Sequence, residues 1–446
     1  MMYDITKSTA PEMPSLNGKG LEAIKLILSQ TSKDMHAPLL PMLFPILGSK
    51  VAGADAEFQY PSGQWLELCG MLAALVADSG NNKGQLGLLV EAIKRDERLS
   101  DQAEIKKYLE YQKTCKKRSQ SKDRPDAPDL CLKCLPSDAT RPGYLKAQMA
   151  AEANGGYTTF IDLPEIDGLN GLCGGHKQVT HLLRLMFDRQ IYQALRATVD
   201  GVTGSALLRT NITMSSNPPS CREFFKSNLF DGTLGRVVLS YKPRSDRDGR
   251  IPRIGKFSDE FYEQLDQYLQ RLTIVKGRYV IRPLNKLIER LAVEMAELAD
   301  LTDSDCLHDM GKRSLISAFK AGCIMWALNN QTWTRPMADV VEWLVWHDTW
   351  SKWQVLGDML LKNGMASTTD SEKKGPANML DSIQETSFSE QQLDALRQSL
   401  GKPVGTATKR QLRVWSARGF IEYSNQTGLY TKTEKYLKMS DGKSKK

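Results

Sequence analysis

The sequence has no apolar run of the roughly 18 to 20 residues that a membrane-spanning helix needs. Its longest candidate, CGMLAALVA at Cys69 to Ala77, has the length of a buried strand. The first twenty residues lack the basic start and the apolar centre of a secretory signal. Cysteine is scarce as well: eight in a chain of 446 residues are too few for a disulfide framework, which fits a reducing compartment. We therefore expect a cytoplasmic protein with no membrane partner.

The composition is typical of a globular protein of two or three domains. Apolar residues make up 41% and charged residues 25% of the chain, which argues against a disordered polymer. The formal net charge of +8 is compatible with a nucleic-acid partner but does not require one. Much of the basic charge lies in residues 113–124, in residues 241–256 and in the C-terminal tail, where solvated loops are the ordinary interpretation.

Short apolar runs alternate with helical patterns from Gln64 to about residue 256. This alternation predicts crossover connections and a parallel sheet, and thus an α/β fold. The strands expected after the first apolar run are YTTFID (157–162), ALLRTNITMSS (206–216) and GRVVLSY (235–241), and a helix is expected over QVTHLLRLMFDRQIYQAL (178–195).

The pattern changes after Lys256, where one helical pattern follows another. Near the C-terminus, two helices precede two short strands joined through NQTG, an order typical of a winged helix-turn-helix domain. The expected organisation is a lead-in with a flexible start at 1–45, an α/β core at 46–256, an α-helical region at 257–365, a linker at 366–385, a winged helix-turn-helix domain at 386–440 and a basic tail at 441–446.

The stretch ALVADSGNNKGQLGLL, Ala74 to Leu89, has the outline of a phosphate-binding loop. Such a loop requires Gly, four residues, Gly, Lys and then Ser or Thr, because backbone N–H groups and the lysine bind phosphate while the hydroxyl binds Mg²⁺. Here Lys83 is in place, Asn82 stands for the second glycine and Gly84 for the hydroxyl residue. Asn visits left-handed conformations more readily than most residues, so the first change is tolerable.

As a bare pattern, this stretch fits an ordinary surface turn slightly better than a nucleotide site. Its position after a buried strand and before a helix favours the nucleotide site. The residues expected to bind the nucleotide are Asp78, Ser79, Gly80, Asn81, Asn82, Lys83, Gly84 and Gln85.

Polar residues at the ends of later strands could complete a nucleotide-hydrolysing site. Asp162 ends the second expected strand and is the candidate Mg²⁺ ligand, with Glu165 as candidate base although two residues intervene. Asn217 could orient the attacking water, and Arg236 could neutralise charge on the γ-phosphate in its own chain or in a neighbour's. An ordinary strand-end Asp and a surface Arg are the alternatives for Asp162 and Arg236.

The order of these pieces resembles the P-loop ATPases of phages and mobile elements, often described as primase-helicase-like. The similar stretches span roughly residues 36 to 360 and are VADSGNNKGQL, LPSDATRPGYLKAQMAAEANGGYTTFIDLPEIDGL, NITMSSNP, LFDGTLGRVVLSY and GKRSLISAFKAGCIMWALNN. The resemblance implies a RecA-like fold, ATP binding at Lys83 and a role in replication or mobilisation of an element. Asn82 and the lack of a Glu directly after Asp162 depart from the family pattern, which bears on hydrolysis more than on binding.

Two other groups of residues have ordinary structural explanations. Cys131 and Cys134, with Cys173 and His176, have a spacing that zinc could use, but buried thiols beside a turn explain the same pattern better. Four tryptophans follow a 3-4-3 spacing and share one helix face, which predicts a core stripe more often than a surface that stacks on bases. They are Trp343, Trp346, Trp350 and Trp353.

The stretch TKRQLRVWSARG is the best candidate for contact with DNA. In a helix-turn-helix the second helix enters the major groove while basic side chains bind phosphates, and a protein-binding role is the alternative. The basic residues of this helix are Lys409, Arg410, Arg413 and Arg418.

The patterns predict an ATP- and Mg²⁺-binding α/β protein that acts on DNA, and the resemblance implies a RecA-like ATPase of a mobile element, helicase- or primase-like. We expect a homo-oligomer, which could form a ring through head-to-tail interfaces, with replication or mobilisation proteins as further partners. The main alternative is a DNA-binding adaptor or replication initiator that binds the nucleotide without hydrolysing it. A regulator whose nucleotide state controls protein partners is a third possibility.

Overall fold

The structure is a computed structural model in which the chain divides into two compact units. The first comprises residues 1–293 and 309–357, and the second residues 294–308 and 358–446. The residues that the structure describes are 5, 7–51, 53–117, 128–169, 172, 176–195, 202–226, 229, 231–244, 255–302, 305–364, 378–400, 402–417, 419–434 and 436–437.

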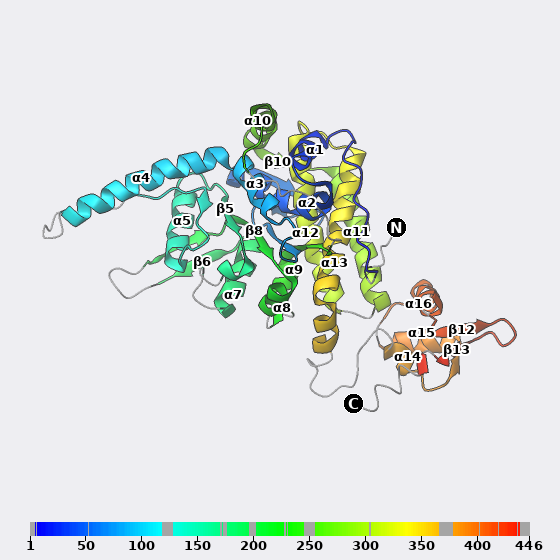
Figure 1. The fold of residues 1–446 in the computed structure, drawn as a ribbon. Coiled ribbons are helices and arrows are strands. Elements are labelled where there is room, and N and C mark those ends of the chain that lie inside the picture. Colours follow the sequence, from blue (N-terminus) through cyan, green and yellow to red (C-terminus); the bar gives the residue numbers. More distant parts are fainter. Residues whose placement is uncertain are drawn as a thin grey trace. The chain divides into compact units, whose positions relative to one another are not determined.

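A five-stranded, all-parallel sheet forms the centre of the first unit (Figure 1). Its strand order is β4-β5-β8-β3-β9. All residues of β3 and β8 are buried, as expected where helices cover both faces of a parallel sheet. The strands are β3 (Leu72–Ala77), β4 (Cys134–Leu135), β5 (Thr159–Leu163), β8 (Thr210–Ser216) and β9 (Val237–Lys242).

This sheet confirms the predicted α/β class, and it is compatible with a Rossmann- or RecA-like core. Because its strands are parallel, their carboxyl ends lie along one edge of the sheet, where open α/β sheets bind their ligands. The strand that precedes the loop, β3, has β8 on one side and β9 on the other.

Helices surround the sheet, and two small sheets lie apart from it. The helices up to residue 236 are α1 (Glu22–Ser29), α2 (Lys33–Gly48), α3 (Gly84–Ile93), α4 (Arg95–Lys117), α5 (Arg141–Ala153), α7 (His176–Phe187), α8 (Pro218–Lys226) and α9 (Thr233–Arg236), with short 3₁₀ turns η1 (Gly53–Asp55) and η2 (Ile166–Gly168). The small sheets are β10-β1-β2, from β1 (Ala56–Gln59), β2 (Trp65–Leu66) and β10 (Gly277–Tyr279), and the pair β6 (Ile191–Ala194) and β7 (Gly204–Leu207).

The expected run of helices follows, as α10 (Asp259–Thr273), α11 (Arg282–Thr302), α12 (Asp305–Leu328) and α13 (Arg335–Gly364). Within the described part of the chain, no helix combines the length and apolarity that crossing a lipid bilayer would demand.

The N-terminal region packs on the sheet. Its helix α2 contacts β3, β8 and β9 although it contains three prolines. Two of the proline carbonyls accept hydrogen bonds from sheet side chains: Pro45 O from Asn211 Nδ2 (3.1 Å) and Pro38 O from Ser240 Oγ (2.8 Å). These bonds hold the apolar helix against the strands that carry Asn211 and Ser240.

Three of the four tryptophans of the predicted stripe belong to the core, and Trp353 is half-buried. Trp343, Trp346 and Trp350 are at most 5% exposed on α13. Two of their indole N–H groups donate to backbone carbonyls of the N-terminal segment, Trp350 to Lys7 O (2.9 Å) and Trp343 to Pro11 O (3.0 Å). The start of the chain, expected to be flexible, is therefore held against α13 from Lys7 to Pro11.

Helix α13 also covers the edge strand β9. Two backbone N–H groups of β9 donate to its side chains, Leu239 N to Asp348 Oδ1 (2.8 Å) and Tyr241 N to Ser351 Oγ (3.0 Å). Asp348 further pairs with the fully buried Lys352 (2.8 Å). The side chains of α13 thus accept hydrogen bonds from the edge strand β9, whose free N–H groups could otherwise pair with a strand of another chain.

The helix predicted over 178–195 is wrong in its second half. The described helix α7 ends at Phe187, and residues 191–194 form β6. Arg189 adopts a left-handed conformation (φ +49°) that ends the helix, and Gln190 N then donates to Leu185 O (2.8 Å). Residues 191–194 form a strand because β6 pairs with β7, a contact that the local sequence pattern does not predict.

The second unit has a small core of its own. Three helices and three antiparallel strands in the order β11-β13-β12 surround Leu393, Leu412 and Trp415. Its elements are α14 (Asn378–Asp381), β11 (Ser387–Phe388), α15 (Glu390–Ser399), α16 (Thr406–Ala417), β12 (Ile421–Ser424) and β13 (Leu429–Lys432). The predicted order of two helices and then two strands is present.

Candidate functional site

The loop that follows β3 turns sharply before α3 begins at Gly84. Gly80 (φ +82°) and Asn82 (φ +58°) both lie in the left-handed region. Asn82 thus adopts the backbone conformation for which the motif prefers glycine, as its chemistry allows. The N-terminus of α3, the positive end of its helix dipole, faces this turn. Two of its first amides already pair with loop carbonyls: Gln85 N donates to Asn82 O (3.1 Å) and Leu86 N to Lys83 O (3.0 Å).

Seven of the eight residues expected to bind the nucleotide are exposed or half-buried, but Gln85 is buried. Ser79, Gly80 and Gly84 are exposed, while the half-buried loop residues are Asp78, Asn81, Asn82 and Lys83. Gln85 is buried, and its Oε1 accepts a hydrogen bond from Ser32 N (2.9 Å) at the start of α2. The structure therefore uses the Gln85 side chain to anchor α2 to α3.

The loop lysine lies beside the carboxyl end of β5. Lys83 Nζ is 3.8 Å from Glu165 Oε1, two residues past the end of that strand. The Lys83 side chain is 15% exposed and that of Glu165 is 57% exposed. The two residues that the sequence assigned to phosphate binding and to base catalysis are thus neighbours.

Asp162 occupies β5 one position before its end. Its Oδ1 accepts a hydrogen bond from the Thr213 hydroxyl (2.8 Å) on the adjacent strand β8. Burial raises the pKa of the Asp162 carboxyl above its ordinary value, and the hydrogen bond from Thr213 opposes that shift. A cation at this position would favour the ionised carboxylate further.

Asn217 follows the carboxyl end of β8. This strand lies between β5, which carries Asp162, and β3, which precedes the loop. Asn217 Oδ1 accepts a hydrogen bond from Ser220 N (2.8 Å) and so caps α8. The side chain is held in one orientation at the same edge of the sheet as Lys83 and Asp162. The strand order explains how residues 83, 162 and 217 come to share one edge.

Arg236 lies at the opposite end of the sheet. It precedes β9, whose first residue, Val237, pairs with Leu72 at the start of β3. The Arg236 guanidinium pairs with Asp188 (2.6 Å) and donates to Gly232 O (2.9 Å). Within one chain, Arg236 is therefore not brought to the loop, because the length of β3 separates them.

Two side chains near the loop were missed by the sequence analysis. Tyr241 and Lys242 end β9, where Lys242 is the register partner of Ala77, the last residue of β3. Burial raises the pKa of Tyr241, with a further contribution from the charge of Asp78 and an opposing one from Arg222. Their positions follow only from the strand order, because the sequence places them at the start of a basic run.

The four residues with zinc-like spacing are only partly described by the structure. Cys131 and Cys134 are half-buried free thiols, and burial raises the pKa of Cys134 to about 11. Cys173 lies outside the described residues, as does the side chain of His176. Among the described residues, no group of three or more His, Cys, Asp or Glu side chains could hold a metal ion.

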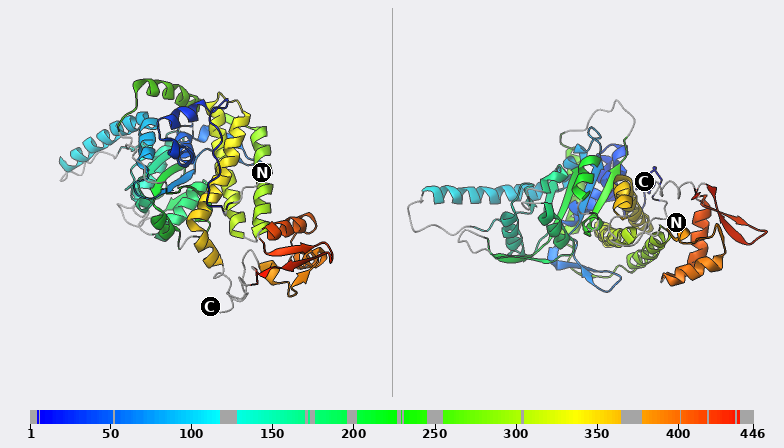
Figure 2. Two further views of the ribbon diagram at one scale, coloured as in Figure 1. Left: turned by 45° about the vertical axis from the view of Figure 1, so that its right-hand side comes forward. Right: turned by 90° about the horizontal axis from the view of Figure 1, so that it is seen from below.

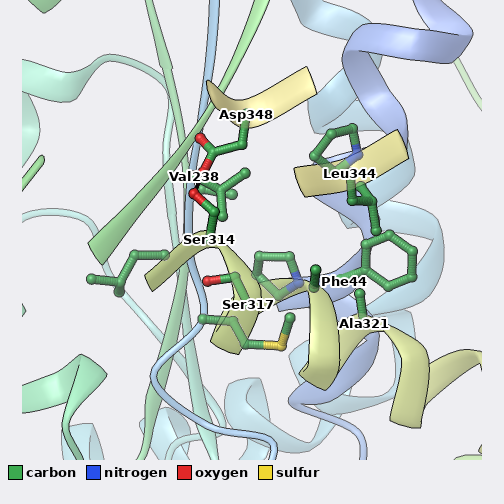
Figure 3. A pocket seen from close by; sticks show the side chains of 13 residues that line it. Phe44, Val238, Ser314, Ser317, Ala321, Leu344 and Asp348 are labelled. Atoms are coloured by element: carbon green, nitrogen blue, oxygen red, sulfur yellow. Dashed lines mark hydrogen bonds between the residues drawn. The ribbon is translucent and has the colours of Figure 1, made fainter. Parts of the chain in front are cut away.

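A cavity of about 20 Å³ lies between α2, the sheet, α12 and α13 (Figure 3). It is lined mainly by apolar side chains, with Ser314, Ser317 and Asp348 as its polar members. Its sheet wall is residues 71–73 and Val238, at the amino ends of β3 and β9 and away from the loop. Its volume has room for about one water molecule, so it is a packing feature and not a nucleotide site.

The basic helix of the second unit presents charge to solvent. Lys409, Arg410 and Arg413 are exposed on α16, whereas Arg418 lies outside the described residues. Arg410 pairs with Glu297 (2.5 Å) and Lys409 with Glu390 (3.9 Å). Arg413 forms no ion pair within the described part of the chain, so it is the most available of the three.

The structure therefore brings Lys83, Asp162, Glu165 and Asn217 to one edge of the sheet and leaves Arg236 at the other. No protein-family model matches the chain, and no curated protein sequence is significantly similar to it.

Proposed function

We propose that this chain is a RecA-like ATPase that binds ATP and Mg²⁺ at the loop 78–84 and acts on DNA in the replication or mobilisation of a mobile element. The observation that carries the proposal is the position of Lys83. It sits between a left-handed turn and the first turn of α3, with its ammonium 3.8 Å from Glu165. A left-handed turn, a helix N-terminus and a lysine together favour a polyphosphate.

Each group at the edge has a role in the proposed reaction. Lys83 would bind the β- and γ-phosphates, and Asp162 would hold Mg²⁺, directly or through water. Mg²⁺ at nucleotides needs only one or two carboxylates, because phosphates and waters complete its shell. Glu165 would accept the proton of the attacking water and Asn217 would orient that water. Lys83 would leave Glu165 for the phosphates when ATP binds.

The position of Arg236 excludes a role at the loop of its own chain, and its ion pair with Asp188 equally fits an ordinary surface arginine. At the amino end of β9 it cannot serve the loop of its own chain, so its role as an arginine finger requires a neighbouring copy. A head-to-tail ring would place one copy's Arg236 against the next copy's nucleotide.

The second unit supports the proposed DNA partner. We assign residues 386–440 to a winged helix-turn-helix domain, because α15, α16 and the hairpin β12-β13 follow in the required order. In such a domain α16 would be the recognition helix, with Arg413 and Lys409 on phosphates. A protein-binding role for the domain is the competing interpretation.

The test is a titration of the purified chain with ATP and Mg²⁺, with and without DNA. The proposal expects saturable ATP binding and DNA-stimulated ATP turnover, both abolished in Lys83→Ala. Lys226→Ala, an exposed lysine paired with Glu223, is the matched control and should retain both activities. Unchanged ATP binding in Lys83→Ala would refute the assignment of the loop.

A DNA-binding adaptor or initiator that binds ATP without hydrolysing it is the second candidate. Gly84 favours it, because the position that usually supplies a Mg²⁺-binding hydroxyl has no side chain. The same titration separates the two: the adaptor would bind ATP through Lys83 without turnover, and its DNA affinity would be indifferent to ATP.

A further inference from the structure

Helix α4 has two halves in different surroundings. Its first half belongs to the body of the first unit: Glu97 pairs with Lys94 (3.1 Å) and with Lys50 (2.7 Å). The Asp101 carboxylate accepts hydrogen bonds from two backbone N–H groups at the start of β4, those of residues 133 and 134. Beyond Asp101 the helix continues away from the sheet (Figure 2). At 1.5 Å per residue, residues 101–117 extend for about 25 Å.

The extended half carries a basic stripe, which we define as Gln102, Lys106, Leu109, Lys113 and Lys116. Their spacing of four, three, four and three residues places them on one face of the helix. All five are exposed, and Leu109 is 49% exposed. Within the described chain, Lys107 pairs with Glu104 (2.6 Å), whereas the three lysines of the stripe form no ion pair.

The stripe has the spacing of a coiled-coil seam without the chemistry of one. Three of its five positions are lysine, so the same face of a second copy would bring like charges together. A polyanion is the better partner for this face. The three lysines span about 15 Å along the helix axis, and a duplex presents several phosphates over that length because it carries one charge per about 1.7 Å. The major groove of a duplex also admits a single α-helix.

We propose that the basic stripe of α4 is a nucleic-acid contact surface that binds the phosphate backbone independently of the second unit. The inference rests on the proposed DNA partner and adds a surface to it. Contacts of this kind position the protein without reading sequence. Leu109, between Lys106 and Lys113, would lie against sugars or bases.

The test is the salt dependence of duplex binding by the full chain. The variant Lys106→Ala/Lys113→Ala/Lys116→Ala should fold normally, because Ala is a strong helix former at exposed positions. Removing one lysine that neutralises a phosphate reduces the slope of log K against log salt by about 0.9, so the slope of the triple variant should be shallower by about 2 to 3. Lys107→Ala, on the same helix but paired, is the matched control and should keep the wild-type slope.

The outcomes are distinguishable. A triple variant with the wild-type slope, in a chain whose slope falls in Arg413→Ala, would overturn the α4 surface and leave the second unit's role intact. A triple variant that changes oligomeric state at constant slope would overturn it in favour of a contact between copies. A chain that binds no DNA at all would overturn the DNA partner as well, while ATP binding at Lys83 would be unaffected.

Discussion

The Thr213 hydroxyl donates a hydrogen bond to Asp162 Oδ1 (2.8 Å) and so links the strand β8 to the carboxylate proposed to bind Mg²⁺. Burial raises the pKa of Asp162, and this hydrogen bond lowers it, because it favours the charged form. Thr213→Val keeps the shape of the side chain and removes the donor. The pKa of Asp162 should therefore rise further.

Since Mg²⁺ binds the ionised carboxylate, affinity for Mg²⁺ declines as the pH falls through the pKa of Asp162. Mg²⁺ binding in the presence of ATP, followed against pH, should weaken at a higher pH in Thr213→Val than in the wild type. Thr213→Ser keeps the hydroxyl and should keep the wild-type profile. Superimposable profiles for Thr213→Val and the wild type would contradict the role of Asp162.

Asn82 has a backbone φ of +58°, a conformation that costs an ordinary residue about 1 to 2 kcal/mol. Asn82→Val should weaken ATP binding by roughly five- to thirtyfold, because the loop must bear this strain to keep its shape. Asn82→Gly should bind ATP as well as the wild type or better. Asn81→Val, at a neighbouring position outside the left-handed region, is the control for side-chain size. Equal dissociation constants for the two valine variants would show that the left-handed turn is not needed.

Glu165 is the acid that pairs with the loop lysine. Glu165→Gln removes one carboxylate that is both the ion-pair partner of Lys83 and the proposed base. It removes no residue proposed to bind phosphate. We expect ATP binding to persist while turnover falls by about 10²- to 10⁴-fold, the usual contribution of general base catalysis. Binding and single-turnover hydrolysis should be measured on the same preparation. Glu223→Gln, an exposed acid paired with Lys226, is the control; a fully active Glu165→Gln would move the base elsewhere.

The sequence predicted the features that depend on neighbours in the chain. The alternation of strands and helices, the turn at Asn82 and the buried tryptophans all follow from local pattern, and the structure contains each of them. Lys83 and Glu165 are neighbours because of the order of the strands in the sheet. Sequence periodicity does not encode that order.

Contacts between distant segments also explain the errors. Residues 191–194 have no strong preference against a helix, and pairing with β7 decides their conformation. Gln85 lies within the motif, but its side chain bonds to Ser32 because α2 packs beside it. The three prolines of α2 make this helix difficult to predict from sequence. Tertiary packing overrides local propensity in each case.

Asp348 and Lys352 form a buried ion pair on α13 beside β9, with 2.8 Å between Oδ2 and Nζ. Asp348→Ala would leave the fully buried ammonium without its partner and the Leu239 N–H without its acceptor. Loss of one member of a buried pair costs about 3 to 5 kcal/mol, so the free energy of unfolding in urea should fall by that amount. Asp339→Ala breaks the exposed pair with Arg335 on the same helix and should change stability by less than about 0.5 kcal/mol. Equal midpoints for the two variants would show that the pair near β9 is solvated.

The separation of Arg236 from Lys83 makes a prediction about mixed oligomers. Arg236→Ala alone should bind ATP normally, because its side chain is bonded to Asp188 at the far end of the sheet. Its turnover should fall by about 10³-fold or more, as for loss of an arginine finger. Lys83→Ala should fail to bind ATP but still present a normal Arg236 to its neighbour.

Mixing the two inactive variants should therefore restore part of the turnover, since some interfaces then combine an intact loop from one copy with an intact Arg236 from the next. The measurement is ATP hydrolysis across a series of mixing ratios, with a maximum expected near equal amounts. Arg184→Ala, whose guanidinium pairs with Asp231, is the control and should need no partner for activity. Turnover that stays at the level of the separate variants at every ratio would show that Arg236 does not act across an interface.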